Sequence, residues 1–494
     1  MSNRALPIRL LAMSATLVMV SVVVSGRVPT PAKAAHDGYI SLAAPARVLD
    51  SRPLGETIDG QFAGIGLRPQ GSTLQLTVAG RAGVPLDAVA VVVNVTVVDT
   101  QGSGYVTAYP CGELQPTASN LNYTVAKTIP NLVIAKIGAG GQVCLFNTGP
   151  THLIADIAGY FPGTDALTPL ATPARLLDTR PDGSTIDSAA VAGGIRPAGS
   201  TQVLQISTRA GIPAGAATVV LNVTVDQPQG SGYITVYPCD APLPTASNLN
   251  YTAGQTIPNA VITKLSATGT VCLYTSSATH LIVDAAGYFA DTSVVVPLAA
   301  PARLLDTRPD GLTIDGAHRA TGVRPTGGTY QLPITGRAGV PAEASAVVLN
   351  VTVDQTQAAG YITVYPTGVS RPNASNVNFV AGQTVPNAVI ARLGSGGSVC
   401  LFNLGATHLI VDIAGYIVGP APAPAGSTCP ADPTPPPTTQ PPGSTPTTQP
   451  SAGTDPRFAT CTAAKAAGYG PYYRGVDPEY AWYEDRDNDG IACE

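Results

Sequence analysis

The chain has 494 residues, of which 12% are charged, 52 are glycine, 46 are proline and only 3 are methionine. This composition is unlike that of helical bundles and favours short strands joined by turns. The formal net charge of −5 argues against nucleic acid as a partner, because such a binder needs clusters of basic residues to neutralise phosphates.

The first 34 residues have the pattern of a secretory signal peptide. Arg4 and Arg9 precede an apolar run over 10–24, and residues 32–34, Ala-Lys-Ala, form a small-x-small cleavage pattern. The alternative is an uncleaved membrane anchor, but the run is shorter than the roughly 20 residues of a spanning helix. We expect a secreted, cell-wall-associated protein without a stable membrane span after cleavage. Its formal net charge becomes −9, because 22 basic residues then face 31 acidic ones.

A repeat with a period of 128 residues fills most of the remaining chain. The motif Leu-Leu-Asp-Thr-Arg-Pro at 176–181 has close counterparts at 48–53 and 304–309. A period of 128 residues exceeds the about 20 to 50 residues of solenoid or propeller repeats and suits an independent domain. We therefore expect three separate domains, like beads on a string, over 42–162, 168–290 and 296–418.

Each copy is predicted to be an antiparallel β-domain. In the third copy, alternating apolar and polar residues predict about eight strands, bounded by turn residues. They are Arg303–Thr307, Thr329–Ile334, Ala346–Val353, Gly360–Tyr365, Ser375–Phe379, Ala388–Leu393, Ser398–Asn403 and Thr407–Ile417. The expected fold class is mostly β, with three tandem, jelly-roll-like sandwiches, and a closed or partly closed barrel as the alternative. The Asn350-Val351-Thr352 match to a glycosylation motif is interpreted as strand sequence.

Taken as a whole, the repeat resembles a module common in secreted proteins of Gram-positive bacteria. The resemblance rests on Leu-Leu-Asp-Thr-Arg-Pro near the start of the copy and His-Leu-Ile-x-Asp near its end. It implies an extracellular accessory domain and no particular activity. A spacer follows at 419–456, since 13 of the 37 residues over 420–456 are proline, and such a segment cannot bury a core.

The last ten residues have the pattern of a calcium loop. Asp485, Asp487 and Asp489 occupy positions 1, 3 and 5, where carboxylates converge on one hard cation, and Gly490 allows a sharp turn. The carbonyl of Ile491 would then face the ion. An EF-hand loop has its bidentate glutamate at position 12, whereas Glu494 is at position 10. A solvated acidic tail is the alternative interpretation.

With Cys461, Pro471-Tyr472-Tyr473 and this ending, residues 457–494 resemble the Excalibur extracellular calcium-binding domain. The family pattern closes in the same Asp-x-Asp-x-Asp-Gly-x-x-Cys-Glu form. The resemblance implies Ca²⁺ as the bound ion and Asp485, Asp487, Asp489 and Glu494 as ligands.

Eight cysteines in an exported chain predict disulfides. Cys111 and Cys144 recur as Cys239 and Cys272 with the same 33-residue spacing, so pairing within each copy is the simplest arrangement. Cys461 is expected to pair with Cys493, closing a module too small for its own core. Cys400 and Cys429 are then left to pair with each other; the alternative is a buried free Cys400 and an exposed Cys429 that could link two chains.

Histidine and aspartate recur in one register of the three copies. His152, His280 and His408 each precede an aspartate by four residues, such as Asp284, and residues four apart in a strand share a face. With the Asp-x-Arg motif, represented by Asp178 and Arg180, they could form a sugar-binding or hydrolytic pocket. A polar network that ties strand ends together explains the same residues and is the preferred interpretation.

Three functional hypotheses follow. The preferred one is a secreted, non-enzymatic calcium-binding protein whose β-domains contact an envelope glycan or another surface protein. The second is an envelope glycan hydrolase with sites in the repeats, which would need two carboxylates about 5 to 10 Å apart. The third is a purely structural surface or spacer protein.

Overall fold

The computed structural model describes residues 1, 38–164, 166–419, 428–430, 457–466, 472–473, 481–483 and 491–492. Residues through Asp432 form one compact unit, and those from Pro433 form a second. The expected signal peptide at 2–34 and most of the expected spacer lie outside the described residues. None of the described helices is long and apolar enough to cross a membrane.

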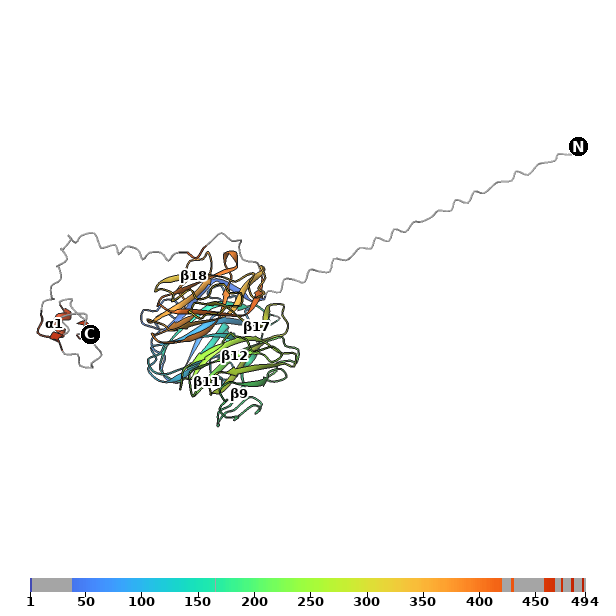
Figure 1. The fold of residues 1–494 in the computed structure, drawn as a ribbon, viewed down its shortest axis with the longest axis horizontal. Coiled ribbons are helices and arrows are strands. Elements are labelled where there is room, and N and C mark those ends of the chain that lie inside the picture. The colour runs from blue at the N-terminus through green and yellow to red at the C-terminus, as the bar shows by residue number, and fades with distance from the viewer. Residues whose placement is uncertain are drawn as a thin grey trace. The chain divides into compact units, whose positions relative to one another are not determined.

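The first unit is built almost entirely of strands, so the mostly β prediction is confirmed (Figure 1). All three copies have the same eight strands. In the first copy they are β1 (Ile40–Asp50), β2 (Ser72–Thr77), β3 (Ala90–Val98), β4 (Gly104–Pro110), β5 (Leu121–Tyr123), β6 (Ile129–Lys136), β7 (Gln142–Asn147) and β8 (His152–Phe161). In the second they are β9 (Thr168–Asp178), β10 (Ser200–Gln205), β11 (Thr218–Asp226), β12 (Gly232–Pro238), β13 (Leu249–Tyr251), β14 (Ile257–Lys264), β15 (Thr270–Thr275) and β16 (His280–Phe289).

The third copy allows a strand-by-strand comparison with the sequence prediction. Its strands are β17 (Val295–Asp306), β18 (Gly328–Pro333), β19 (Ala344–Asp354), β20 (Gly360–Pro366), β21 (Val377–Phe379), β22 (Val385–Arg392), β23 (Ser398–Asn403) and β24 (His408–Val418). All eight predicted strands are present. The largest difference is β17, which begins eight residues before Arg303, because its first part also pairs with β24 beyond a register shift. Short 3-10 turns occupy Ala139–Gly141 and Ser395–Gly397.

The strands of each copy form two four-stranded antiparallel sheets, which gives six sheets in the unit. In the first copy the orders are β1-β8-β3-β6 and β2-β7-β4-β5, and the other copies repeat both orders. The two sheets of a copy enclose one apolar core, as in the second copy, where Leu221 and Val283 of one sheet pack with Val236 and Leu273 of the other. Six four-stranded sheets in one body equal the number of blades in a six-bladed propeller. The sequence analysis instead expected separate tandem domains.

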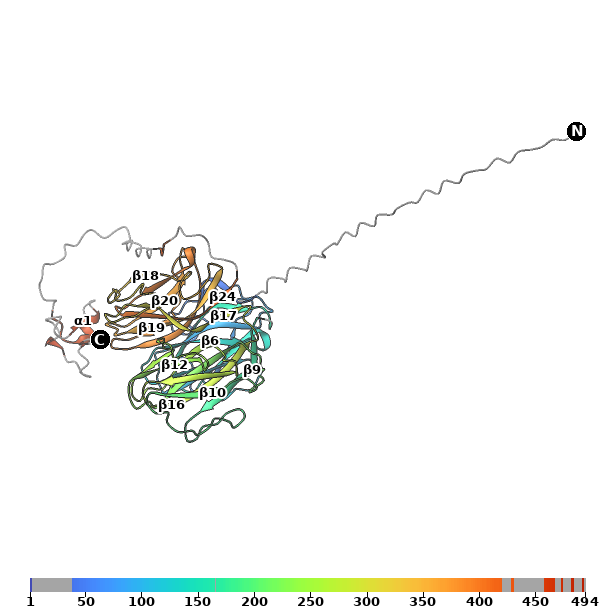
Figure 2. The same cartoon turned by 45° about the vertical axis from the view of Figure 1, so that its right-hand side comes forward.

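The expectation of independent beads is wrong, because the three copies share a central core. It contains Ala90, Val92, Leu132 and Ile134 of the first copy and residues at the same repeat positions of the other two, such as Val220, Ile262, Val348 and Ile390. Phe161 and Phe289 meet there with ring centroids 5.8 Å apart. Figures 1 and 2 both show the strands of the three copies packed together.

Burial of both faces of β3, β11 and β19 explains this association. Every residue of β3 is buried: Val91 and Val93 belong to the core of the first copy, and Ala90 and Val92 to the central core. A sheet with one solvated face alternates apolar and polar residues, whereas a strand buried on both faces is a continuous apolar run. The run Ala90-Val91-Val92-Val93 therefore requires a second partner surface, which the other copies provide.

Candidate functional site

The Asp-x-Arg motif and the aspartate that follows the histidine form one buried ion network in each copy. In the second copy, Arg175 Nε donates to Asp284 Oδ1 at 2.8 Å and Arg175 Nη1 donates to Asp178 Oδ2 at 3.3 Å. Arg180 binds Asp178 through two hydrogen bonds of 2.9 and 2.8 Å. Arg175 joins the two aspartates of this network, and the sequence analysis did not identify it. The same repeat position holds Arg47 and Arg303 in the other copies, and this recurrence could have revealed its role.

The recurrent histidines do not join this network. Nδ1 of His280 lies 3.1 Å from Thr179 Oγ1, and His152 and His408 make the same contact with Ser51 and Thr307. His280 and Asp284 therefore do not form one polar pocket. His280 bonds Thr179, whereas Asp284 bonds Arg175.

Burial determines what the aspartates can do chemically. Asp178 and Asp284 expose 0% and 2% of their surface, so protein atoms enclose both carboxylates. Burial raises the pKa of Asp284, although hydrogen bonds and charge from Arg175 oppose the rise. Burial acts in the same direction on Asp178, but the hydrogen bonds and charge of Arg180 prevail and lower its pKa. Two arginine-bound, enclosed carboxylates are suited to a structural role.

The same aspartates also connect neighbouring copies. The backbone N–H of Ser247 donates to Asp412 Oδ2, and that of Ser375 donates to Asp156 Oδ2, each at 3.2 Å. The backbone of Ser119 bonds Asp284 in the same way. Each buried Arg-Asp pair therefore ties the end of one copy to a loop of another, which agrees with the preferred interpretation of a structural polar network.

A ring of asparagines closes the three-copy arrangement. Side-chain hydrogen bonds run from Asn131 to Asn222 at 2.8 Å, from Asn259 to Asn350 at 2.8 Å, and from Asn387 back to Asn94 at 2.7 Å. The first two bonds join consecutive copies, and the third joins the last copy to the first. Asn350 is buried and also donates to the carbonyl of Ser247, so the Asn-x-Thr segment lies within a strand, as expected.

A cavity of about 730 Å³ lies where segments of all three copies approach one another. Lys127, Gln255 and Gln383 line it at the same repeat position, as do Ile129, Ile257 and Val385. The first two copies also contribute Tyr105, Asn122, Arg180 and Asp226 to the lining of the cavity. The volume is that of a small-molecule pocket, and amide, hydroxyl and aromatic groups are suited to a polar ligand.

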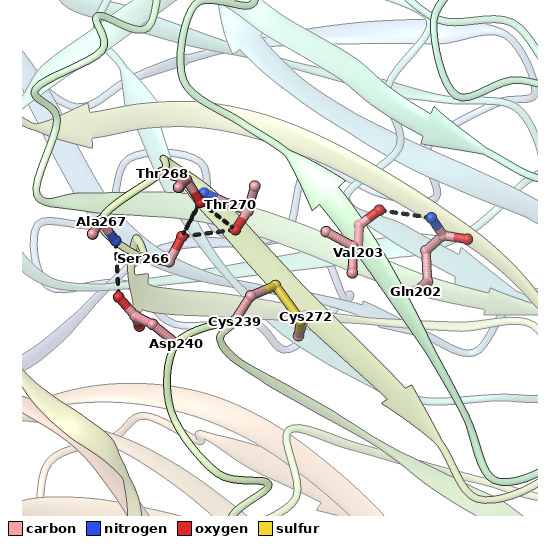
Figure 3. Close-up of a disulfide and its surroundings, with 9 residues drawn as sticks. All are labelled: Gln202, Val203, Cys239, Asp240, Ser266, Ala267, Thr268, Thr270 and Cys272. Atoms are coloured by element: carbon pink, nitrogen blue, oxygen red, sulfur yellow. Dashed lines mark hydrogen bonds between the residues drawn. A yellow bond between two sulfur atoms is a disulfide. The ribbon is translucent and has the colours of Figure 1, made fainter.

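Three disulfides lie in the first unit. Cys111–Cys144 and Cys239–Cys272 join equivalent positions of the first two copies, with Cα atoms 5.0 Å apart in both, which is the expected pairing. Figure 3 shows the second bond beside three mutually hydrogen-bonded hydroxyls, those of Ser266, Thr268 and Thr270.

The third copy has a different disulfide, Cys400–Cys429. Thr367 stands where the other copies have their first cysteine, and its hydroxyl lies 3.8 Å from Cys400 Sγ. Cys429 comes instead from beyond β24, and its backbone N–H donates to Gln331 Oε1 at 3.3 Å. The bond therefore fastens the chain that leaves the β unit onto the outer sheet of the third copy.

The second unit is held by aromatic contacts and short elements. Helix α1 (Cys461–Ala466) precedes β25 (Tyr472–Tyr473), which pairs with β26 (Ile491–Ala492). The rings of Tyr472 and Tyr483 stack with centroids 5.4 Å apart, and the Tyr483 hydroxyl accepts a hydrogen bond from the backbone N–H of Phe458. Cys461 is disulfide-bonded, and its expected partner Cys493 lies outside the described residues.

The predicted calcium ligands are only partly placed. Ile491 begins β26 opposite Tyr473, so the chain leaves the acidic loop as a strand paired with β25. Asp485, Asp487, Asp489 and Glu494 lie outside the described residues. Among the side chains that the structure does describe, there is no group of three or more metal-binding residues.

Comparison with known families identifies this second unit. Residues 458–494 match the model of the Excalibur calcium-binding domain, which confirms the resemblance found in the sequence. The match assigns calcium binding to the C-terminal module. It does not extend to the three β copies.

Two viral proteins are among the solved structures that are similar to the chain. No curated protein matches the chain. Among solved structures, a protein from a study of the triple jelly-roll fold and turret assembly in an archaeal virus is 9% identical, covering 78% of this chain and 96% of its own, with a TM-score of 0.18. A chain of Sulfolobus turreted icosahedral virus is also 9% identical, covering 72% and 85%, with a TM-score of 0.18.

Proposed function

We propose that this chain is an exported, non-enzymatic calcium-binding protein of the cell envelope whose β unit contacts a glycan or another surface molecule. The observation that supports calcium binding is the Excalibur match over 458–494, together with three aspartates at loop positions 1, 3 and 5. In this proposal Asp485, Asp487, Asp489 and Glu494 bind the ion with the carbonyl of Ile491. Calcium offsets half of the negative charge of these four carboxylates and draws the two ends of the loop together.

Titration calorimetry of the full chain with Ca²⁺ tests the ligand assignment. We expect a Kd in the range of about 10⁻⁴ to 10⁻³ M that is typical of extracellular modules, and loss of the binding heat in Asp487→Ala. Asp455→Ala, which removes a carboxylate outside the loop, is the matched control and should bind normally. Unchanged binding by Asp487→Ala would refute these ligands.

We further infer that each copy is a jelly-roll sandwich. The strand orders β1-β8-β3-β6 and β2-β7-β4-β5 support this, since the chain passes between two facing sheets that share a core. The three sandwiches then act as one rigid scaffold, because the asparagine ring and the buried Arg-Asp pairs connect them. A scaffold of this kind presents its loops and its cavity in a fixed geometry to an external ligand.

A glycan is the proposed ligand of the 730 Å³ cavity. The cavity offers an aromatic ring from Tyr105, planar amides from Asn122 and Gln383, and the cation of Lys127, which can recognise hydroxyl groups and the apolar face of a sugar. A glycan array with the full chain tests this. Binding that Tyr105→Ala removes supports the proposal, and the absence of all glycan binding favours the purely structural alternative.

A non-enzymatic role rests on the enclosed state of the recurrent aspartates. The hydrolase alternative predicts release of reducing ends from cell-wall polymer and loss of that activity in Asp178→Asn or Asp284→Asn. We expect no turnover by the intact chain. Measured turnover that depends on either aspartate would overturn this part of the proposal.

A further inference from the structure

A second, smaller cavity of about 190 Å³ lies between the first and third copies. It shares no lining residue with the central cavity. Three arginines line it, Arg47, Arg52 and Arg371, and none of its ten lining residues is acidic. The remaining lining groups include the Tyr361 hydroxyl and the amides of Asn373 and Asn378. A cationic wall with several further hydrogen-bonding groups is suited to an anionic ligand.

Arg52 has less compensating charge than its counterparts. Arg180 and Arg308 have a second aspartate near Nη1, with Asp226 at 3.9 Å and Asp354 at 3.4 Å. The first copy has Val98 at that repeat position. It also has Leu54 where the other copies have Asp182 and Asp310, whose charges act on Arg180 and Arg308.

Two acidic residues, Asp50 and Asp99, remain near Arg52. Asp50 binds its Nε and Nη2 at 2.9 and 2.7 Å, and Asp99 contributes a weaker charge interaction. Asp50 also accepts a hydrogen bond from Arg47, whose main partner is Asp156. The first copy thus has one fewer acidic residue near this arginine than the second or the third, and Nη1 of Arg52 has no aspartate like Asp226 or Asp354 beside it.

Arg371 adds a charge that the other two copy interfaces lack. The same repeat position holds Gln115 in the first copy and Leu243 in the second. The Arg371 guanidinium lies 4.0 Å from the centroid of the Phe402 ring, and its Nη1 donates to the Tyr361 hydroxyl at 3.0 Å. Stacking and this hydrogen bond hold the guanidinium in place, so little side-chain entropy is lost when a ligand binds.

We propose that this cavity is a binding site for an oxyanion, a phosphate or carboxylate group carried by a small polar ligand. Guanidinium groups bind both through paired, charge-assisted hydrogen bonds. Arg52 belongs to the first copy and Arg371 to the third, so the bound group bridges the two copies that the chain does not join directly. Occupancy therefore stabilises the closed arrangement of the β unit as well as recruiting the ligand.

The test uses the full chain in calcium-free buffer at constant ionic strength, with inorganic phosphate and glucuronate as probes and chloride as the reference. We expect saturable binding of at least one probe and a higher melting temperature in its presence. Arg371→Gln introduces the residue that the first copy has at this position, and Val98→Asp introduces the acid of the other two copies. Each should weaken binding by about tenfold or more, because each removes or neutralises one charge-assisted contact.

The matched control is Gln115→Arg, which places a guanidinium at the interface where Arg180 is already compensated by Asp226 and Asp182. It should leave the affinity of the site unchanged. Binding of phosphate alone identifies phosphate as the group recognised, and binding of glucuronate alone identifies carboxylate. No binding of either probe above chloride, or equal binding by the parent, Arg371→Gln and Val98→Asp, would overturn the proposal.

Discussion

The β unit and the C-terminal module are stabilised in different ways. The β unit has four large apolar cores and places its buried ion pairs and asparagines at the interfaces between copies. In the module, the described residues offer one buried tyrosine stacked on another, a two-residue strand pair and a disulfide-bonded Cys461. A small module of this kind depends on covalent links and a metal ion, whereas a large unit can depend on packing.

The largest effect on the β unit is expected where a buried ion pair between two adjacent strands is broken. Asp284→Ala removes the main partner of Arg175 and leaves the buried guanidinium with only its longer contact to Asp178, so the β unit should lose about 3 kcal/mol of unfolding free energy. Denaturant titration measures this. Asp182→Ala, at an exposed position of the same copy, is the control and should change stability little. Equal stability of both variants would contradict a structural role for Asp284.

In the module, the largest single contribution is expected from a disulfide. If Cys461 pairs with Cys493, the bond closes about 30 residues and contributes on the order of 3 to 4 kcal/mol in the chain-entropy model. Cys461→Ser should therefore abolish the folded module and its calcium binding while leaving the melting of the β unit unchanged. Non-reducing peptide mapping checks the pairing, and finding Cys461 linked to any other cysteine would refute it.

The asparagine ring tests how strongly the copies depend on one another. Asn387 donates to Asn94 and to the carbonyl of Asn376, and its Oδ1 accepts the backbone N–H of Leu132. Asn387→Ala leaves these buried groups without partners, at a cost of about 2 to 3 kcal/mol. Calorimetric melting should still show one transition at a lower temperature. The exposed Asn373→Ala is the control, and unaltered melting of Asn387→Ala would mean that the ring is dispensable.

A smaller effect is expected from the recurrent histidine. His280→Ala removes one contact with the Thr179 hydroxyl and should lower stability by about 1 kcal/mol. Glycan or anion binding by the full chain should persist, because His280 lines neither cavity. A variant that keeps its melting temperature but loses ligand binding would instead identify the histidine register as a binding site.

The smallest effect is expected at a partly exposed ion pair. Hydrogen bonding to Arg337 lowers the pKa of Asp315 to about 2 in the folded chain, so its stabilising effect is present above its unfolded pKa of about 4 and lost as pH falls towards 2. Solvent screens this pair, and Asp315→Asn should cost less than about 1 kcal/mol at pH 7. The difference in melting temperature between variant and parent should therefore be larger at pH 7 than at pH 2, where about half of Asp315 has become protonated. A difference of equal size at both pH values would point to packing.

The sequence by itself determined the local elements of this protein. Alternating and continuous apolar runs placed all eight strands of the third copy, because side-chain direction in a strand follows directly from residue order. The 33-residue cysteine spacing gave the disulfides of the first two copies. The spacing of Asp485, Asp487 and Asp489 indicated the calcium module, since ligands of one loop are close in sequence.

Only the tertiary structure decided how the three copies are combined. A run such as Ala90-Val91-Val92-Val93 shows that both strand faces are buried, but it does not show what covers the second face. The bond from Asn387 to Asn94 joins residues 293 positions apart, and no local pattern specifies such a contact. The proposed oxyanion site between the first and third copies depends on Val98 and Arg371 in the same way. Each is a single difference among the repeats until folding places the first copy against the third. Electrostatic interactions at short range then combine the two differences into one charged site.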